Sequence, residues 1–321
     1  MKVKSSSRAP FSEFSHKLTQ LFLDAPFGLA IFDLASRYMH VNGRMAEMNV
    51  KPIEEHLGKS MTEVNQGVAS VLEPIVRHAM EQGAGFVDLE TEVSAAIGGG
   101  APEPVYWRIG CYLLKNEDGA LLGTGVIVRD ITEQKAKDAA QEERLKFESF
   151  LADLSAAFIL VPVSDVDQKI EQWLQRIVDF LAFERCSIWQ FLPEDGRLHK
   201  THSYSLPGIK VPPEIVDEEV PVWTVMWKRG DMFRISDVDE LPDNLWREKK
   251  YCMDMGGIKS FLFIPLSIGG AVVGLVSFAS YRVKRTWPDL LVQRLRLLGD
   301  VFGNALERRR ADQRVQKALA E

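Results

Sequence analysis

The 321-residue sequence is poor in cysteine, and this scarcity limits the chemistry that the chain can carry. Its three cysteines, Cys111, Cys186 and Cys252, are odd in number, lie far apart and form no Cys-x-x-Cys pair. That spacing argues against structural disulfides and favours a reducing compartment. We therefore expect free thiols and a cytoplasmic protein.

Motifs for catalysis and for phosphate binding are also missing. The sequence contains no GxxxxGK[ST] loop, and the glycine-rich run Gly119–Gly125 lacks the lysine that such a loop needs. No Ser/His/Asp or Cys/His set stands at a recognisable spacing. We therefore expect this segment to be no enzyme.

Basic residues are outnumbered, and long apolar helices are absent. The net charge of −6 argues against direct nucleic-acid binding. The N-terminal MKVKSSSRAPFSEF has no apolar run after its lysines, so it is not a secretory signal. Ser260–Tyr281 has no charged residue over 22 positions, which is long enough for a membrane helix. Because Pro265 and the Gly269-Gly270 pair interrupt that run, we predict a buried β-hairpin and no membrane span.

At its centre the chain has a helix-forming stretch, Asp130–Leu154, with no glycine and no proline. Its apolar side chains recur at helical spacing, interrupted by Glu143: Ala136, Ala140, Phe147, Phe150 and Leu154. The run is too short to identify a coiled coil on its own. It is either a solvated linker helix or a helix that pairs with its copy in a dimer and carries a signal. Since domains average about 150 residues, a globular domain is expected on each side.

Before this helix, the pattern alternates strands and helices. Residues 1–17 are expected to form a mobile arm, and Asn42 is placed to cap a short helix. The predicted strands are Gly28–Leu34, Tyr38–Val41, Phe86–Val93, Val105–Leu114 and Leu121–Arg129, with an amphipathic helix at Val68–Met80 and a loose Gly98-Gly99-Gly100 connection. Alternation along the fourth strand predicts that Trp107 points into the core.

Two segments of this half resemble the PAS family: APFGLAIFDLASRYMHVNGRMAEMN and GVIVRDITEQK. The resemblance implies an antiparallel five-stranded sheet that cups a small ligand pocket. It also implies a signal-transmitting exit motif at Asp130, Ile131 and Thr132. In the family the aspartate is held by a basic partner, for which the candidates here are Arg37, Arg108 and Arg129. The alternative is that Asp130 only caps the linker helix.

The second half begins with a strongly amphipathic helix, Val166–Leu181, and ends with a long helix, Trp287–Glu321. Between them we predict strands at Cys186–Leu192, Leu198–Tyr204 and Phe233–Ile235, helices at Trp223–Arg229 and Pro242–Met253, and then the hairpin.

Three segments of this half resemble the GAF family: FERCSIWQF, GIKSFLFIPLSIGGAVVGLVSFAS and RTWPDLLVQRLRLLGDVFGNALERRRA. The resemblance implies a six-stranded antiparallel sheet flanked by helices. The expected fold class is therefore α+β, in two domains joined by a long helical linker. The expected plan is an arm at 1–17, a PAS-like domain at 18–132, a linker at 133–153, a GAF-like domain at 154–310, and the start of an output-connecting helix at 311–321.

Cofactor motifs of these families are not supported. His199 and His202 stand three apart in a strand, so they should point to opposite faces and share no metal. Haem at His78 or His56 is disfavoured against ordinary surface histidine. The flavin cysteine motif is absent, and Cys252 stands on the wrong side of Tyr251 for a covalent bilin.

Aromatic and sulfur side chains are the remaining candidates for lining a ligand pocket, with plain core packing as the alternative. They are Phe32, Met45, Met48, Trp107 and Cys111 in the first half, and Trp189, Phe191, Trp223, Tyr251 and Phe263 in the second.

Taken together, the sequence predicts a sensory input module of a bacterial two-component system, with an unknown small-molecule ligand. We expect a homodimer formed through Phe147–Leu154 and Leu291–Ala305. The chain ends within a helical pattern, VQKALAE, which is expected to continue into an output domain in cis, a histidine kinase. The alternatives are the input region of an enhancer-binding transcription activator, or a ligand-free PAS/GAF dimerisation scaffold.

Overall fold

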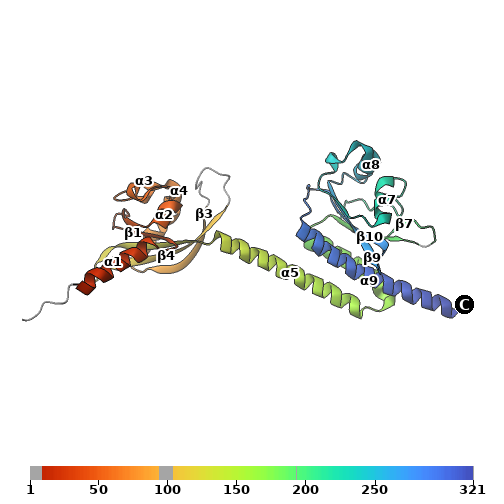
Figure 1. The fold of residues 1–321 in the computed structure, drawn as a ribbon, viewed down its shortest axis with the longest axis horizontal. Helices are drawn as coiled ribbons and strands as arrows, with labels where there is room; N and C mark the ends of the chain where they lie inside the picture. The colour runs from red at the N-terminus through yellow and green to blue at the C-terminus, as the bar shows by residue number, and fades with distance from the viewer. Residues whose placement is uncertain (1–8, 94–103, 193, 321) are drawn as a thin grey trace, which may run out of the picture. The chain divides into compact units, whose positions relative to one another are not determined.

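The computed structural model describes residues 9–93, 104–192 and 194–320, and it divides at Arg144 and Leu145 into two compact units. Each unit contains an antiparallel five-stranded sheet with helices packed against it (Figure 1). The predicted Gly98-Gly99-Gly100 connection lies outside the described residues.

The first unit follows the element order expected from its sequence. Its elements are α1 (Ala9–Leu23), β1 (Gly28–Phe32), β2 (Tyr38–Val41), α2 (Gly43–Met48), α3 (Met61–Val64), α4 (Gln66–Gln82), β3 (Phe86–Val93), β4 (Val105–Lys115) and β5 (Leu121–Asp130). The strand order in the sheet is β2-β1-β5-β4-β3. One prediction was wrong: residues 9–17 belong to helix α1 rather than to an arm.

Local signals in the sequence explain where these elements begin and end. The Asn42 side-chain oxygen accepts hydrogen bonds of 2.9 Å from the backbone N–H groups of Met45 and Leu29, so it caps α2 and fixes β1 to β2. Helix α4 ends at Gly83, whose φ of 62° is a left-handed conformation that glycine adopts without strain. The predicted phase of β4 is confirmed, because Trp107 is only 1% exposed in the core between the sheet and α2–α4.

Helix α5 (Thr132–Leu160) spans the boundary between the units. The second unit then contains α6 (Val166–Leu181), β6 (Arg185–Phe191), β7 (Leu198–Ser205), α7 (Pro221–Arg229), β8 (Phe233–Ile235), α8 (Trp246–Asp254), β9 (Ser260–Ile268), β10 (Ala271–Ser280) and α9 (Asp289–Ala320). Its strand order is β7-β6-β10-β9-β8.

The uncharged run from Ser260 is the predicted hairpin, in which β9 and β10 turn at Gly269 and Gly270. These glycines have φ values of 57° and 85°, the left-handed pair that a tight hairpin turn requires. Among the helices of the described residues, none is long and apolar enough to cross a bilayer.

Five strands pair in this sheet among the described residues, where the sequence predicted six. The polar segment after β7 makes only one isolated bridge, between Ile215 and His199. Pro212 and Pro213 lie three and two residues before Ile215, and proline offers no N–H to a strand ladder. This explains why a sixth strand does not form there.

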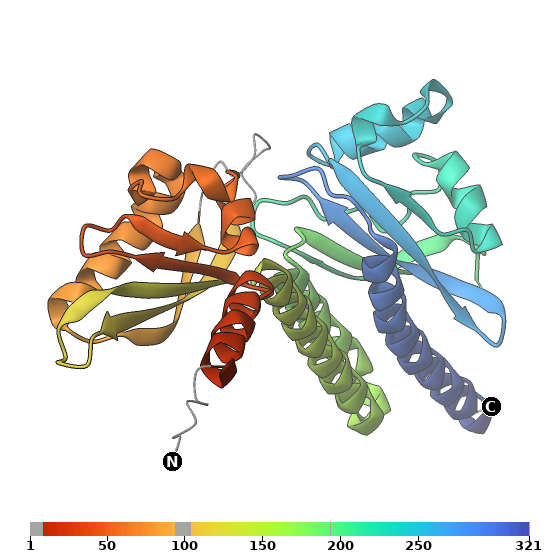
Figure 2. The same cartoon turned by 60° about the vertical axis from the view of Figure 1, so that its left-hand side comes forward.

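The second sheet has two differently covered faces. Helices α5, α6 and α9 pack on one face, and α7 and α8 lie over the other, as Figure 1 shows for the labelled helices and Figure 2 for α9 in dark blue. On the first face the Phe150 ring stacks on Phe180 at 4.2 Å between ring centres, and Phe158 meets Phe302 edge-on at 5.6 Å.

This packing overturns the reason for the predicted dimer seams. Phe147, Phe150 and Leu154 of α5 are buried in the core of the second unit. On α9, Leu295, Leu298, Phe302 and Ala305 are buried in the same core. The apolar faces read from the sequence therefore pack within one chain, and they are not available to a partner.

Candidate functional site

The ten predicted pocket residues gather into two groups, one in each unit. Phe32, Met45, Trp107 and Cys111 are buried in the first core, and Met48 packs against it. Trp189, Trp223, Tyr251 and Phe263 are buried in the core that the sheet of the second unit forms with α7 and α8, and Phe191 packs against them. The residues are thus brought together as expected, while their binding of a ligand stays a prediction.

The first core offers little polar chemistry. Burial raises the pKa of the Cys111 thiol to about 11, so the side chain stays neutral. His56 is fully buried, which corrects its interpretation as a surface residue, whereas His78 is exposed as expected. Both His56 ring nitrogens have partners: Nδ1 lies 2.8 Å from the Pro52 carbonyl, and Nε2 lies 2.9 Å from the Asn49 amide. Haem ligation by His56 would break one of these contacts.

In the second unit, aromatic rings fill the space between the sheet and α7. Trp223 lies 5.2 Å from Phe263 between ring centres, and Trp227 lies 4.9 Å from the same ring. The Trp227 indole N–H is buried and has no hydrogen-bond partner among the described residues. The group is therefore mostly apolar, with an unused donor inside it.

Arg185, which the sequence analysis did not single out, is the most unusual residue of this group. It begins β6 and is only 1% exposed. Its Nη1 donates to the Lys210 carbonyl at 3.2 Å, but its Nη2 has no partner among the described residues. The sequence feature that could have identified Arg185 is a charged residue at the start of the otherwise uncharged strand RCSIWQF.

A pocket of about 420 Å³ opens beside this group, and Tyr251 forms part of its wall. Trp246 and Met255 supply further apolar lining, and charged side chains stand around it: Glu218, Glu219, Asp254, Arg247 and Lys250. Lys210, whose carbonyl contacts Arg185, donates through Nζ to the backbone carbonyl of Asp254 at 2.6 Å. The loop that touches Arg185 is thus held to the end of α8.

Cys252 is fully buried next to Tyr251. Burial raises the pKa of its thiol to about 12, so the nucleophilic thiolate is scarce at neutral pH.

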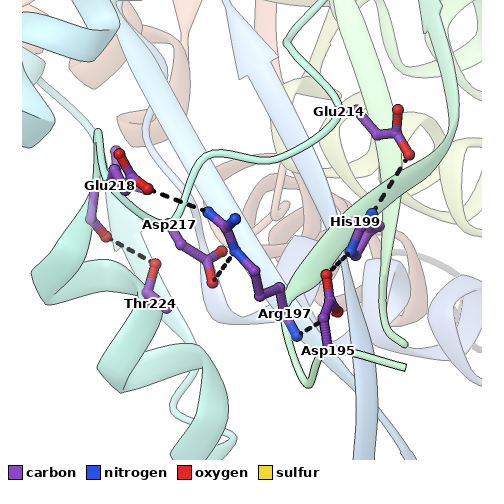
Figure 3. A network of polar contacts seen from close by, with 8 residues as sticks. Asp195, Arg197, His199, Glu214, Asp217, Glu218 and Thr224 are labelled. Atoms are coloured by element: carbon purple, nitrogen blue, oxygen red, sulfur yellow. Dashed lines mark hydrogen bonds and ion pairs between the residues drawn. The ribbon is translucent and has the colours of Figure 1, made fainter. Parts of the chain in front are cut away.

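A polar network ties the β6–β7 turn to the segment before α7 (Figure 3). His199 contacts Asp195 at 2.8 Å and Glu214 at 3.4 Å, and the hydrogen bond with Asp195 raises the pKa of the histidine. Arg197 lies 3.6 Å from Asp217 and 3.8 Å from Glu218. These contacts hold the Pro212–Val220 segment against the edge of the sheet.

His199 and His202 do not lie on opposite faces, which corrects the sequence argument. A β-bulge between Ile188 and Trp189 shifts the pairing with β7, so both histidines line the same open cleft of about 1030 Å³. His202 instead contacts Asp167 of α6 at 2.9 Å, and burial lowers its pKa. Across the part of the chain that is described, no group of three metal-ligating side chains forms.

The exit motif connects β5 to α5 through backbone contacts. The Asp130 carboxylate accepts a 2.9 Å hydrogen bond from the Thr132 N–H, where α5 begins, and the Thr132 hydroxyl accepts one of 2.9 Å from the backbone N–H of Tyr106. Ile131 is buried, and its N–H donates to the Tyr106 carbonyl. These contacts fit the capping alternative for Asp130.

None of the three candidate arginines forms an ion pair with Asp130 among the described residues. Arg37 pairs with Glu63, Arg129 lies over the Phe27 ring, and Arg108 pairs with Glu90 at 2.6 Å. Glu90 of β3 also contacts Lys135 in the first turn of α5 at 2.5 Å. Glu90 therefore joins the sheet to the linker helix by ion pairs. The sequence did not predict this role, because the two basic partners of Glu90 come from distant segments.

Comparison with known families gives two matches in tandem. The family described as PAS fold matches residues 22–136, and the family described as GAF domain matches residues 163–307.

Among curated proteins, the methanogenesis regulatory histidine kinase FilI of Methanothrix harundinacea (strain 6Ac) is 26% identical over 218 residues. The match covers 65% of this chain and 24% of that kinase, so the chain spans about a quarter of the relative's length.

Solved GAF domains resemble about half of the chain. The GAF domain from Acinetobacter phosphoenolpyruvate-protein phosphotransferase is 12% identical with a TM-score of 0.41, covering 51% of this chain and 93% of that one. The phycocyanobilin-bound GAF domain from a cyanobacterial phytochrome is 16% identical with a TM-score of 0.43, covering 52% and 96%. Likenesses this distant say nothing about what the present chain binds.

Proposed function

Since the chain belongs to the PAS and GAF families, with one domain of each in tandem, we propose that it is the sensory input module of a signal-transduction protein. In this proposal a small ligand binds the module, and helix α9 carries the signal to a histidine-kinase output domain. The related kinase from Methanothrix harundinacea supports this output over a transcription activator.

The observation that carries the proposal is the anchoring of α5 at both ends. Its first turn is joined to the sheet of the first unit by the Lys135–Glu90 ion pair. Its last turns are buried in the core of the second unit through Phe150, Leu154 and Phe158. A helix fixed in two domains transmits a shift of one domain to the other, which a flexible linker does not.

Dimerisation, also proposed, uses a different helix face from the one predicted from the sequence. On α9, Leu290 and Leu297 are 60% and 48% exposed at a seven-residue spacing that continues through Asn304. On α5, Leu145 and Ile159 are 56% and 72% exposed at twice that spacing. Heptad-spaced apolar side chains that their own domain leaves uncovered are typical of a parallel two-helix interface, and a polar seam residue such as Asn304 specifies its register.

The ligand-free scaffold remains as a second candidate function, because aromatic side chains already fill the second core. A scaffold requires the same dimer but no coupling to an output. A change in helix register should therefore alter the output of a sensory module and have no effect in a scaffold.

The test is to fuse residues 1–321 to a histidine-kinase catalytic core and insert one to seven residues after Asp312. If α9 transmits the signal, the autophosphorylation rate should change with each added residue and return to the starting value at seven, since a heptad restores the helical phase. A rate that does not depend on insertion length would leave only the scaffold.

A further inference from the structure

The open cleft of about 1030 Å³ lies on the opposite face of the second sheet from the aromatic group around Trp223. Its walls come from the end of β6, from β7, from the β9–β10 turn, from the start of α6 and from the C-terminal part of α9. Helices α6 and α9 pack on one face of the sheet, whereas α7 and α8 pack on the other. The cleft is therefore separate from the candidate pocket residues.

Many of the charged side chains in this cleft are already paired. Asp167 of α6 contacts both His202, at 2.9 Å, and Arg309 of α9. Glu307 contacts Arg314 at 2.5 Å. The lining holds five carboxylates and five lysine or arginine side chains, so the cleft as a whole does not select a ligand by net charge. Selection depends instead on lining groups whose hydrogen-bonding capacity is unused.

Gln190 of β6 has such an unused donor. The residue is 5% exposed and lines the cleft, and its Nε2 is buried without a hydrogen-bond partner among the described residues. Ile188, two residues earlier in the strand, packs in the core with α9, so strand alternation places Gln190 on the same side. Buried polar groups in native proteins are nearly always hydrogen-bonded, so this amide indicates a missing acceptor.

The half-buried guanidinium of Arg310 lies beside this amide and lines the same cleft. Its Nη2 donates at 3.3 Å to the carbonyl of Phe191, the residue that follows Gln190. Within the described residues, no carboxylate lies in ion-pair contact with Arg310. Burial lowers the pKa of Arg310, and the charges of Glu307 and Glu194 oppose that effect from a longer distance. Arginine stays charged in proteins, so the cleft contains a charged donor next to a neutral one.

Two neighbouring N–H donors, one of them charged, fit an oxyanion. A carboxylate or phosphate offers several acceptor oxygens on one centre, and its hydrogen bonds to a guanidinium are charge-assisted. Lys317 lies seven residues, or about two turns, beyond Arg310 on α9 and also lines the cleft. The donors thus lie on the end of β6 and on the part of α9 that leads out of the domain.

We propose that this cleft of the GAF domain binds a small molecule through a carboxylate or phosphate group, which accepts hydrogen bonds from Gln190 Nε2 and the Arg310 guanidinium. Arg310 belongs to α9, the helix that carries the signal in the proposed function. The bound group therefore contacts the output-connecting helix directly. The inference names a ligand class and a binding place for the proposed sensory function, and it rests on that function.

The probes are acetate and inorganic phosphate, which separate the two kinds of oxyanion. Acetamide is the neutral analogue of acetate, and sodium chloride fixes the ionic strength. In the purified 1–321 chain, at least one anion should shift the NMR signals of the Gln190 side-chain amide and the Phe191 backbone N–H in a saturable way. Acetamide should not shift them, and the side-chain amide of Asn244, exposed outside the cleft, should not respond. If neither anion shifts the Gln190 signal, the proposal is wrong.

Two variants locate the site, with the Phe191 backbone signal as the readout. Arg310→Met removes the charged donor and should weaken anion binding by about tenfold or more. Gln190→Glu keeps the size of the side chain but replaces the donor by a carboxylate, which should repel the anion and abolish binding. The matched control is Arg282→Met, which removes an exposed arginine outside the cleft and should bind like wild type.

Wild-type affinity in both Arg310→Met and Gln190→Glu would place the anion elsewhere and overturn the proposal. An equal response to acetamide and acetate would also overturn it, because the charge would then play no part. If one variant does not fold, the affinity of the other decides. Because these measurements need no output domain, their failure is distinct from failure of the insertion experiment.

Discussion

At the scale of single residues, His56 is fully buried although polar residues precede it in the sequence. The sequence grouped His56 with ordinary surface histidines. The structure instead buries it, with Nδ1 donating to the Pro52 carbonyl and Nε2 accepting from Asn49. Nothing in the local pattern predicts this, since the contacts depend on how the short turns between α2 and α3 close over the core.

This burial predicts a pH dependence of stability in the first unit. Desolvation lowers the pKa of His56 below its unfolded value of about 6.5. The stabilising contribution of the neutral ring is therefore complete above that pH and is lost as the pH falls through the lower folded pKa.

The measurement is an NMR titration of the His56 ring in the intact chain, together with the unfolding free energy of the first unit between about pH 7.5 and 5. The ring should titrate below a model histidine, and His56→Gln should flatten the loss of stability at acid pH. A ring that titrates above a model histidine would contradict the buried hydrogen-bonded arrangement.

Residue patterns did predict much of what the core contains. Alternation in β4 correctly placed Trp107 and Cys111 in the first core, and the ring-rich strands correctly gathered Trp189 and Phe263 in the second. Arg185 could not be found this way, because a sequence does not show which buried side-chain atoms lack a hydrogen-bond partner.

At the scale of elements, the sequence signals predicted the strands and helices closely, but they did not predict which elements pack or pair with one another. The helix Val166–Leu181 and the strands Tyr38–Val41 and Phe233–Ile235 occur with the predicted bounds. On α5, Phe147, Phe150 and Leu154 of the predicted apolar face are buried, whereas Ala136 and Ala140 are exposed. A face alone also does not say whether another chain or the same chain covers it. For His199 and His202 the strand rule failed because a bulge adds one residue to the pairing.

The junction between the first sheet and α5 gives a prediction at this scale. Glu90→Gln should release Lys135 and Arg108 together, because one carboxylate contacts both. Amide hydrogen exchange in the first turn of α5 should then become faster, and the effect should shrink at high salt. Asp130→Asn should change little, since asparagine also accepts the capping hydrogen bond.

The matched control is Glu133→Gln, which removes the ion pair with Lys137 on the same helix but no contact to the sheet. It should leave exchange near the wild-type rate. If Asp130→Asn accelerates exchange while Glu90→Gln does not, the aspartate holds the junction and the role assigned to Glu90 is wrong.

At the scale of the whole molecule, the proposed signalling requires two chains that assemble through α5 and α9. In one chain, the buried faces of these helices complete the core of the second unit, and Leu145, Ile159 and Leu297 remain exposed. In the proposed dimer, a partner chain covers this second face. A chain that stays alone would leave it in water.

The most direct test is the mass of the 1–321 chain by light scattering and sedimentation at micromolar concentration. We expect about twice the chain mass of 36.2 kDa. Leu297→Glu should reduce the mass to that of one chain, whereas Leu122→Glu, an equally exposed leucine on β5, should remain dimeric. A wild-type chain of 36.2 kDa across that range would contradict dimeric signalling through these helices.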